Sequence, residues 1–178
     1  DISRDFDAFF NTIDFVSIFH LVGGEPLMNP AHPEVIEYIG ENFRDKIGKL
    51  LLTTNGTLVP KSRTFELLKK YSFTVSVSDY TDSIKYGRRL GQLLEKLKEY
   101  EIVHFVRQDI KWSDFGDPNE VRFFGESENI KHFDSCTAPY KGINQGKYFY
   151  CHLNTSAILS GMQNMSENDY FDLNLNSN

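Results

Sequence analysis

Hydrophobic residues in the first 107 positions of the chain form two alternating patterns. Continuous apolar runs, rich in β-branched and aromatic residues, occupy residues 15–22, 49–53, 73–77 and 102–106. Short uninterrupted runs of this kind are typical of parallel strands that are covered on both faces, since the residues on both faces are then hydrophobic and do not alternate with polar ones. We therefore expect four buried parallel strands in this part of the chain.

The segments between these runs carry hydrophobic residues at helical spacing, and residues 1–10 read as a further helix. Strands begin roughly every 25 to 35 residues, which is the period of a strand followed by a crossover helix. The pattern predicts an α/β fold on a parallel sheet, either a full barrel, a partial barrel or an open doubly wound sheet. The three helical stripes consist of Val35, Ile36, Ile39 and Phe43, of Phe65, Leu68 and Tyr71, and of Leu90, Leu93, Leu94, Leu97 and Tyr100.

The pattern changes after Gln108. Residues 109–133 are rich in acids, with scattered glycine and proline, and predict a long irregular segment. Beyond them, residues 146–152 and 157–159 flank the pair Asn154-Thr155, which predicts a small β-hairpin. The remaining residues are polar and rich in asparagine, so we expect weak order near the end of the sequence.

Composition narrows the classes of function. Hydrophobic residues make up 40% and aromatic residues 14% of the chain, enough for a packed core. The net charge of −6, with acids and bases interspersed, argues against a nucleic-acid partner, because phosphates select basic surfaces. No apolar run is long enough to cross a bilayer, so we expect no membrane partner. Two cysteines are too few for a disulfide scaffold, which favours a reducing, cytoplasmic compartment.

Residues with ligand-binding chemistry follow the first predicted strand. Gly23, Gly24, Glu25 and Pro26 come directly after it. The two glycines allow main-chain groups to approach a ligand, Glu25 supplies a carboxylate, and Pro26 stiffens the turn. Main-chain groups next to a carboxylate are suited to binding an ammonium group. The alternative interpretation is a tight turn with an N-capping acid.

The second strand is followed by Thr54 and Asn55, which can bond a ligand or close the turn before the next helix. The third strand ends with Ser76, Ser78 and Asp79, whose hydroxyls and carboxylate suit a ribose diol or an N-cap. In parallel sheets, ligands bind at the carboxyl ends of strands. The successive strand ends therefore favour a single site.

The fourth strand ends with Arg107. Its guanidinium can clamp a carboxylate through two parallel hydrogen bonds. The alternative interpretation is a surface ion pair with Asp109. A carboxylate contact would place Arg107 in the same site as the other strand ends.

Two of these segments resemble motifs of the radical S-adenosylmethionine (radical SAM) family of iron–sulfur enzymes. Residues 19–26 read F-H-L-V-G-G-E-P, and residues 52–56 read L-T-T-N-G. In that family, a partial (βα)6 barrel has a G-G-E-P turn after its second strand and a T-N-G turn after its third. The resemblance implies that SAM binds with its methionine amino group at Gly23, Gly24 and Glu25, its ribose near Ser76, Ser78 or Asp79, and its methionine carboxylate near Arg107.

The C-terminal region resembles the start of the auxiliary-cluster extension called the SPASM or twitch domain. Cys136 and Cys151 frame a C-x9-G-x4-C pattern, with Gly146 at the expected position. The resemblance implies that both cysteines ligate an auxiliary [4Fe–4S] cluster, together with cysteines that this sequence does not contain. Two alternatives remain, a zinc site completed by His132 and His152, or two buried thiols without a metal.

The sequence lacks the C-x3-C-x2-C loop that holds the catalytic [4Fe–4S] cluster in this family. We expect that loop one βα unit before residue 15, with residues 1–12 as the helix that follows it. The chain therefore reads as a fragment of a longer enzyme and is expected to be inactive alone. On this interpretation, residues 1–108 form a truncated partial barrel and residues 109–178 an incomplete extension.

By this resemblance, the intact enzyme is an oxidoreductase that cleaves SAM reductively and abstracts hydrogen from a peptide or small-molecule substrate. Its electrons would come from a donor such as a flavodoxin or ferredoxin, and the cofactors would carry the difficult chemistry. Two other classes stay open: a non-enzymatic zinc-binding module and a nucleotide-binding α/β domain. The diglycine turn lacks the spaced glycines of a phosphate loop, which argues against the latter.

Overall fold

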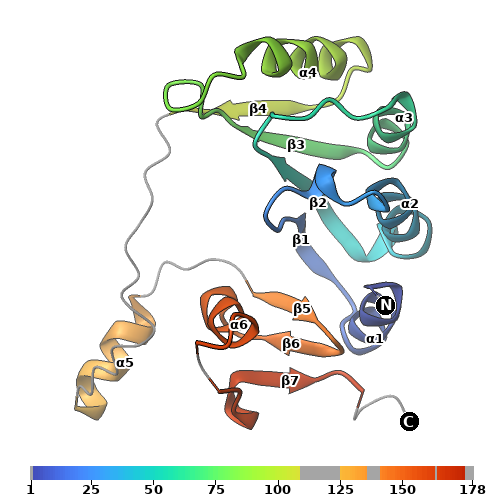
Figure 1. Cartoon of the computed structure of the whole chain (residues 1–178). Helices are drawn as coiled ribbons and strands as arrows, with labels where there is room; N and C mark the ends of the chain where they lie inside the picture. Colours follow the sequence, from blue (N-terminus) through green and yellow to red (C-terminus); the bar gives the residue numbers. More distant parts are fainter. Residues whose placement is uncertain (1, 109–124, 136–140, 163, 175–178) are drawn as a thin grey trace. The chain divides into compact units, whose positions relative to one another are not determined.

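The computed structural model describes residues 2–108, 125–135, 141–162 and 164–174 (Figure 1). These residues form two compact units, one of residues 13–108 and one that combines residues 2–12 with those from 125 onward. Within the described residues, no helix has the length and hydrophobicity that crossing a bilayer requires.

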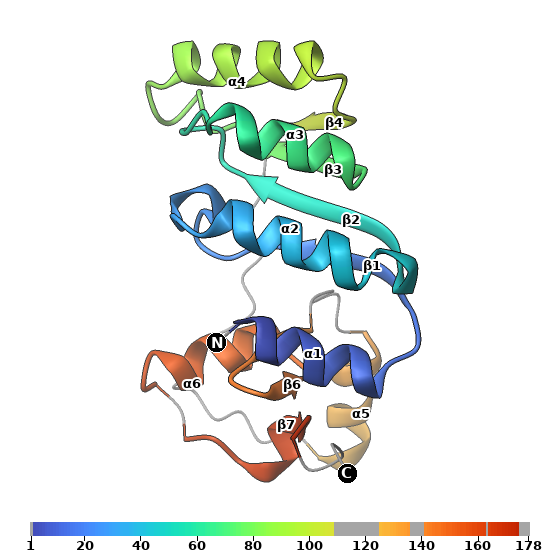
Figure 2. The same ribbon diagram turned by 90° about the vertical axis from the view of Figure 1, so that its right-hand side faces the viewer.

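The first unit contains a parallel sheet with the strand order β1-β2-β3-β4. Figure 2 shows the three connecting helices side by side on one face of this sheet. A complete doubly wound sheet has helices on both faces, whereas the described helices of this unit cover one face. The strands are β1 (Val16–Leu21), β2 (Ile47–Thr54), β3 (Phe73–Ser78) and β4 (His104–Arg107); the helices are α2 (His32–Asn42), α3 (Ser62–Lys70) and α4 (Gly87–Glu99), with short 3-10 turns η1 (Pro26–Met28) and η2 (Arg44–Lys46).

The prediction of an α/β fold with four parallel strands is confirmed. The prediction that all four strands are buried is wrong: β2 and β3 are mostly buried, whereas β1 and β4, at the edges of the described sheet, are mostly exposed or half-buried. Each strand lies within a few residues of its predicted run, and each hydrophobic stripe belongs to one helix or its last turn. Consecutive order with helices on one face is the arrangement of a barrel segment. The described sheet has four strands, with β1 and β4 at its two edges, and closure into a barrel stays a prediction.

Helices α3 and α4 end in the same way. Tyr71 and Tyr100 follow the two helices, and their main-chain N–H groups close the last helical turn. The next residues, Ser72 and Glu101, have φ angles of 57° and 51°. A single left-handed residue after a helix reverses the chain direction, which returns it to the sheet for the next strand.

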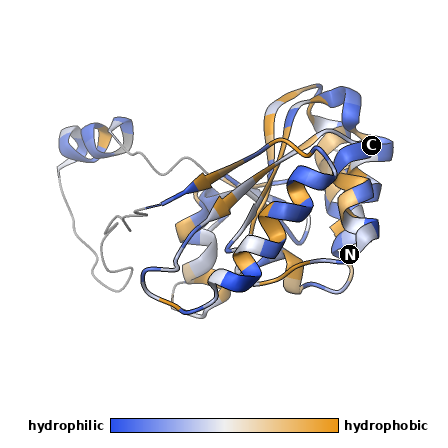
Figure 3. Cartoon of the chain, turned by 90° about the horizontal axis from the view of Figure 1, so that it is seen from above, coloured by the Kyte–Doolittle hydropathy of each residue, from blue (hydrophilic) through white to orange (hydrophobic). Residues whose placement is uncertain are grey.

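The core of the first unit lies between the helices and one face of the sheet. The parallel register aligns Leu50 with Phe73 and Leu52 with Val75, and all four side chains are buried. Figure 3 shows hydrophobic residues along the strands and on parts of the helices, with hydrophilic residues elsewhere on the helices. Burial of each such side chain contributes about 1.5–3 kcal/mol, so this layer holds the strands in register. The helices contribute Ile36, Ile39, Phe65, Leu68, Leu93 and Leu97.

The second unit contains a three-stranded antiparallel sheet in the order β5-β6-β7. Helix α1 (Ile2–Thr12) confirms the helix predicted at the start of the chain and packs on this sheet. The Asp5 carboxylate accepts a hydrogen bond from the Gly146 N–H at 2.7 Å, and the rings of Phe9 and Tyr148 lie 5.6 Å apart. The other elements are α5 (Glu126–Asp134), β5 (Gly142–Asn144), β6 (Lys147–Phe149), α6 (His152–Leu159), η3 (Glu167–Asp169) and β7 (Tyr170–Asp172).

The contacts of α1 place residues 2–12 in the second unit, whereas the sequence pattern predicted them to be part of the first. Helix α1 has a strongly amphipathic pattern, and its buried face includes Phe6, Phe9 and Phe10. The Asp5 and Phe9 contacts with the antiparallel sheet show where part of that face is covered. The assignment of residues 1–108 to a barrel and 109–178 to an auxiliary-cluster extension stays a prediction.

The predicted hairpin turn at Asn154-Thr155 is wrong. Both residues lie in α6, where the Thr155 hydroxyl donates to the carbonyl of Cys151. The hairpin instead joins β5 and β6 through Gln145 and Gly146, whose φ angles are 50° and 72°. Two consecutive positive φ angles are the signature of the two-residue turn that fits twisted antiparallel strands.

Candidate functional site

The face of the sheet opposite the helices, called here the helix-free face, carries polar side chains near the carboxyl ends of the strands. Paired residues of parallel strands point to the same side, and successive residues alternate. Because Leu50, Leu52 and Val75 belong to the helix side, Thr53, Ser76 and Ser78 point to the helix-free face. The register pairs Thr53 with Ser76 and Ser78 with Arg107, and places His20 beside Leu51 on the same face.

Hydrogen bonds connect these side chains across neighbouring strands. His20 Nε2 lies 2.6 Å from Thr53 Oγ1, and Arg107 Nη2 donates to Ser78 Oγ at 3.1 Å. Ser76 is 2% exposed, and its hydroxyl has no hydrogen-bond partner among the described residues. Burial, reinforced by the positive charge of Arg107, lowers the pKa of His20 below its usual value of 6.5. The imidazole is therefore neutral at neutral pH.

The diglycine turn after β1 leaves its main chain accessible. Gly23 has a φ angle of 157°, which side-chain-bearing residues rarely adopt. A Cβ atom built on Gly23 or Gly24 would have no heavy atom within 4 Å. The turn thus leaves room for a ligand to approach its peptide groups, as expected for a main-chain contact.

The Glu25 carboxylate joins the loops after β1 and β2. It accepts hydrogen bonds from the main-chain N–H groups of Leu27 at 3.1 Å and Asn55 at 2.6 Å. Pro26 occupies the first position of η1, where the missing N–H is not needed. Glu25 therefore has the capping role that the sequence left as an alternative, and it also makes a contact that the sequence did not predict. A direct contact of its carboxylate with SAM stays a prediction.

The side chains of Thr54 and Asn55 hold the loop after β2. Thr54 is 1% exposed, and its hydroxyl accepts from the Gly56 N–H at 3.2 Å. Asn55 Oδ1 accepts from the N–H of Thr57 at 2.9 Å and from its hydroxyl at 2.6 Å. Of the two threonines at this strand end, Thr53 faces the polar side chains. The predicted contact, Thr54, lies on the helix side instead, and the period-2 alternation of a strand identifies Thr53 as the residue on the other face.

The loop after β3 is built around Asp79. Its main-chain N–H donates to the Arg107 carbonyl at 2.9 Å, which connects the ends of β3 and β4. The carboxylate accepts from the Thr81 N–H at 2.9 Å, and hydrogen bonds from Thr81 lower the pKa of Asp79. Asp79 is thus a carboxylate at neutral pH, as a ribose contact requires. The Asp109 partner considered for Arg107 lies outside the described residues.

Tyr86 supports the same loop from the start of α4. Its hydroxyl accepts from the Tyr80 N–H at 2.7 Å and donates to the Ser78 carbonyl at 3.4 Å. Burial raises the pKa of Tyr86, so the hydroxyl stays protonated and can donate. These bonds tie the carboxyl end of β3 to the first turn of α4.

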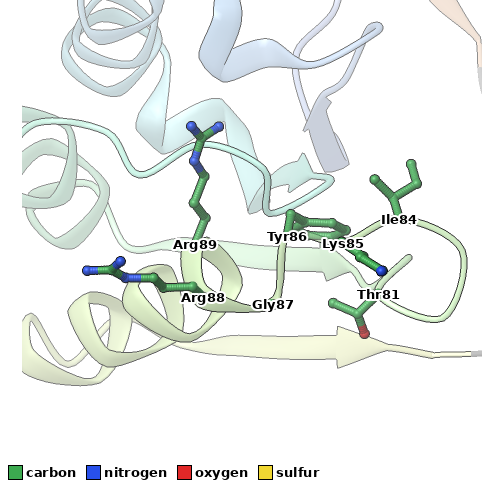
Figure 4. Close-up of a pocket in the computed structure, with 7 residues that line it drawn as sticks. All are labelled: Thr81, Ile84, Lys85, Tyr86, Gly87, Arg88 and Arg89. Carbon is green, nitrogen blue, oxygen red and sulfur yellow. The ribbon is translucent and has the colours of Figure 1, made fainter.

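A pocket of about 710 Å³ lies beside this loop, at the start of α4 (Figure 4). Its walls include Thr81, Lys85, Tyr86, Arg88 and Arg89. Figure 4 shows the side chains of Lys85, Arg88 and Arg89 pointing in different directions rather than toward one point. None of the residues predicted to bind SAM lines this pocket, so it is separate from the helix-free face.

The predicted metal ligands are only partly described. Cys151 is partly exposed at the N-terminus of α6, next to His152, and forms no disulfide within the described residues. Cys136 lies outside the described residues. His132 lies in α5. The described residues contain no group of three or more His, Cys, Asp or Glu side chains that could hold a metal ion. Neither an iron–sulfur cluster nor a zinc ion therefore has a complete set of ligands in this part of the chain.

No protein-family model matches this chain, and comparisons with curated proteins and with solved structures find no significant match.

Proposed function

We propose that the carboxyl-terminal edge of the parallel sheet binds SAM, and that the chain forms part of the (βα) barrel of a radical SAM enzyme. The observation that carries this proposal is the convergence of four strand ends at one edge. Glu25 joins the loops after β1 and β2, and the Asp79 N–H joins the ends of β3 and β4. These two contacts join the strand ends in two pairs, and the pairing of β2 with β3 lies between the two pairs.

The open diglycine turn suits the amino group of SAM, because peptide carbonyls at Gly23 and Gly24 can accept from an ammonium group without steric obstruction. Ser78 and Asp79 end the third strand and suit the ribose hydroxyls. Arg107 ends the fourth strand and suits the methionine carboxylate. These three sets follow β1, β3 and β4, which end at the same edge of one parallel sheet.

In the radical SAM family, SAM and a reduced [4Fe–4S] cluster supply the hydrogen-abstracting chemistry. The two cysteines of this sequence are too few for the C-x3-C-x2-C loop, so this chain contributes SAM binding and orientation rather than the ligands of the catalytic cluster. The substrate class, a peptide or a small molecule, and the electron donor follow from the family resemblance alone.

Isothermal titration of the purified chain with SAM tests the proposal. Gly24→Val places a side chain beside the turn, where its Cβ atom has no heavy atom within 4 Å, and this side chain should block a ligand. We expect at least a tenfold loss of SAM affinity for this variant. Gly91→Val is the matched control, because Gly91 also has open space around it but lies in α4.

Two results would contradict the proposal: no SAM binding by the wild-type chain, or equal losses in the two valine variants. Titration with adenosine and with ATP completes the experiment. Preference for either over SAM would favour the nucleotide-binding class, since neither carries the methionine amino and carboxylate groups.

A further inference from the structure

The loop after β2 contains a chemically reactive pair, Asn55 and Gly56. Asn55 is the one asparagine of this sequence that directly precedes a glycine. Because glycine has no Cβ atom, its main-chain nitrogen can approach the preceding side chain with little steric hindrance. In a chain that is free to move, such a pair undergoes deamidation without an enzyme.

Deamidation of this pair consumes only water. The Gly56 nitrogen attacks Cγ of Asn55, and the new N–Cγ bond closes a five-membered succinimide ring. The side-chain nitrogen of Asn55 leaves as ammonia and takes the proton of the Gly56 N–H. Water then opens the ring at either of its two carbonyl groups. The product is aspartate, or isoaspartate, in which the main chain runs through the former side chain.

The folded loop restrains the nucleophile of this reaction. The Gly56 N–H donates to Thr54 Oγ1 at 3.2 Å, and Thr54 is buried. Gly56 is also buried, and a Cβ atom built on it would lie 2.8 Å from Leu90 Cδ1 and 3.3 Å from Val77 Cγ1. The Gly56 nitrogen therefore reaches Cγ of Asn55 only when the loop moves away from α4 and the end of β3.

The side chain that would be attacked is held by the same loop. Asn55 Oδ1 accepts from the Thr57 N–H at 2.9 Å and from the Thr57 hydroxyl at 2.6 Å. Two donors on a carbonyl oxygen also stabilise the negative charge that develops there during attack, as in an oxyanion hole. This activation has no effect while the Gly56 nitrogen is held, because the N–Cγ bond cannot form. Restraint of the nucleophile therefore decides the rate in the folded chain.

Glu25 limits the movement of this loop. Its carboxylate accepts from the Asn55 N–H at 2.6 Å, which anchors the residue that would react. A reaction that needs local opening proceeds at the rate of the open state multiplied by the population of that state. Loss of a hydrogen bond to a charged acceptor raises such a population by about tenfold or more. Loss of the Glu25 contact should therefore accelerate deamidation by a similar factor.

We propose that Asn55 is a self-modification site, which Glu25 and Thr54 protect from deamidation while the loop after β2 is closed. Conversion to isoaspartate adds a carbon atom to the main chain between the N–H groups of Asn55 and Gly56. These two N–H groups then no longer have the spacing that their acceptors, Glu25 and Thr54, require. Deamidation after opening therefore prevents the loop from closing again. The inference holds whether or not the chain binds SAM.

The test measures the fraction of deamidated Asn55 by mass spectrometry while the purified chain is incubated at neutral pH. Chromatography separates the peptides that carry aspartate and isoaspartate. The same chain unfolded in guanidinium chloride gives the rate without protection. We expect the folded chain to react at least tenfold more slowly than the unfolded chain. Equal rates in the two states, or no deamidation of the unfolded chain, would overturn the inference.

Two pairs of variants test the protecting contacts, with circular dichroism to show that each variant is folded. Glu25→Ala should deamidate about tenfold faster than the folded wild type, whereas Glu34→Ala, which loses an exposed ion pair, should match it. Thr54→Val removes the acceptor of the Gly56 N–H and should accelerate deamidation about threefold to tenfold. Its control is Thr74→Val, the same substitution at a buried threonine in β3. If Glu25→Ala does not fold, Thr54→Val decides, and rates no higher than in the controls would refute the inference.

Discussion

Replacement of Glu25 tests whether its carboxylate holds two loops together. In Glu25→Ala, the main-chain N–H groups of Leu27 and Asn55 lose their shared acceptor, which lies 3.1 and 2.6 Å away. Hydrogen bonds to a charged acceptor contribute about 1.5–3 kcal/mol each, and the larger value applies to buried pairs. Glu25 is partly exposed, so water replaces part of the loss. We expect the free energy of unfolding to fall by about 2–3 kcal/mol.

Urea denaturation followed by circular dichroism measures this change through the transition midpoint. Glu25→Gln keeps one carbonyl acceptor, so its free energy of unfolding should fall by about half as much as that of Glu25→Ala. Glu34→Ala is the control, because Glu34 forms an exposed ion pair with Arg63, and such pairs contribute below about 1 kcal/mol. If Glu25→Ala unfolds at the same urea concentration as the wild type, the carboxylate does not join the loops. A loss of SAM affinity is also expected, since both loops carry predicted contacts.

The remaining predictions concern one titrating group and one packing contact. Because burial and Arg107 lower the pKa of His20, the unfolded chain binds this proton more readily, and stability should fall as pH decreases below about 6.5. His20→Gln should remove that part of the pH dependence of the urea midpoint; an identical profile would contradict the reasoning. Gly40→Ala would place a Cβ in the ring of Tyr71 and should lower the free energy of unfolding by about 1–3 kcal/mol. Gly91→Ala, in open space on α4, should instead raise the free energy of unfolding by up to about 1 kcal/mol. Higher stability of both variants would argue against the Tyr71 contact.

The parallel sheet could be predicted from the sequence because its signals are local. The four apolar runs and three helical stripes fall on the observed elements, and a βα period of this length is long enough for the crossover helix that a parallel connection needs. The hairpin was misplaced for the opposite reason. Asn154-Thr155 has turn-forming composition, but the positive φ angles occur at Gln145 and Gly146, and glutamine gives little local indication of them.

The site was predicted less completely, because its contacts join residues that are distant in the chain. Glu25 and Asn55 are 30 residues apart, and the Glu25 carboxylate accepts a hydrogen bond from the main-chain N–H of Asn55. Because a main-chain N–H does not depend on the residue type, the sequence gives no sign of this contact. Thr53 and Thr54 are neighbours of identical type, so only the register decides which faces the polar side chains. His20 lies inside an apolar run, and its partner became evident only once β1 and β2 were paired.

The edge position of β1 and β4 has a consequence for the behaviour of this chain in solution. Ile18 and Val22 in and after β1, and Phe105 and Val106 in β4, are between 38% and 58% exposed. An edge strand with exposed apolar side chains is a template for pairing with another molecule. Self-association at high concentration should therefore begin at these two strands, and a lysine at position 18 or 106 should suppress it.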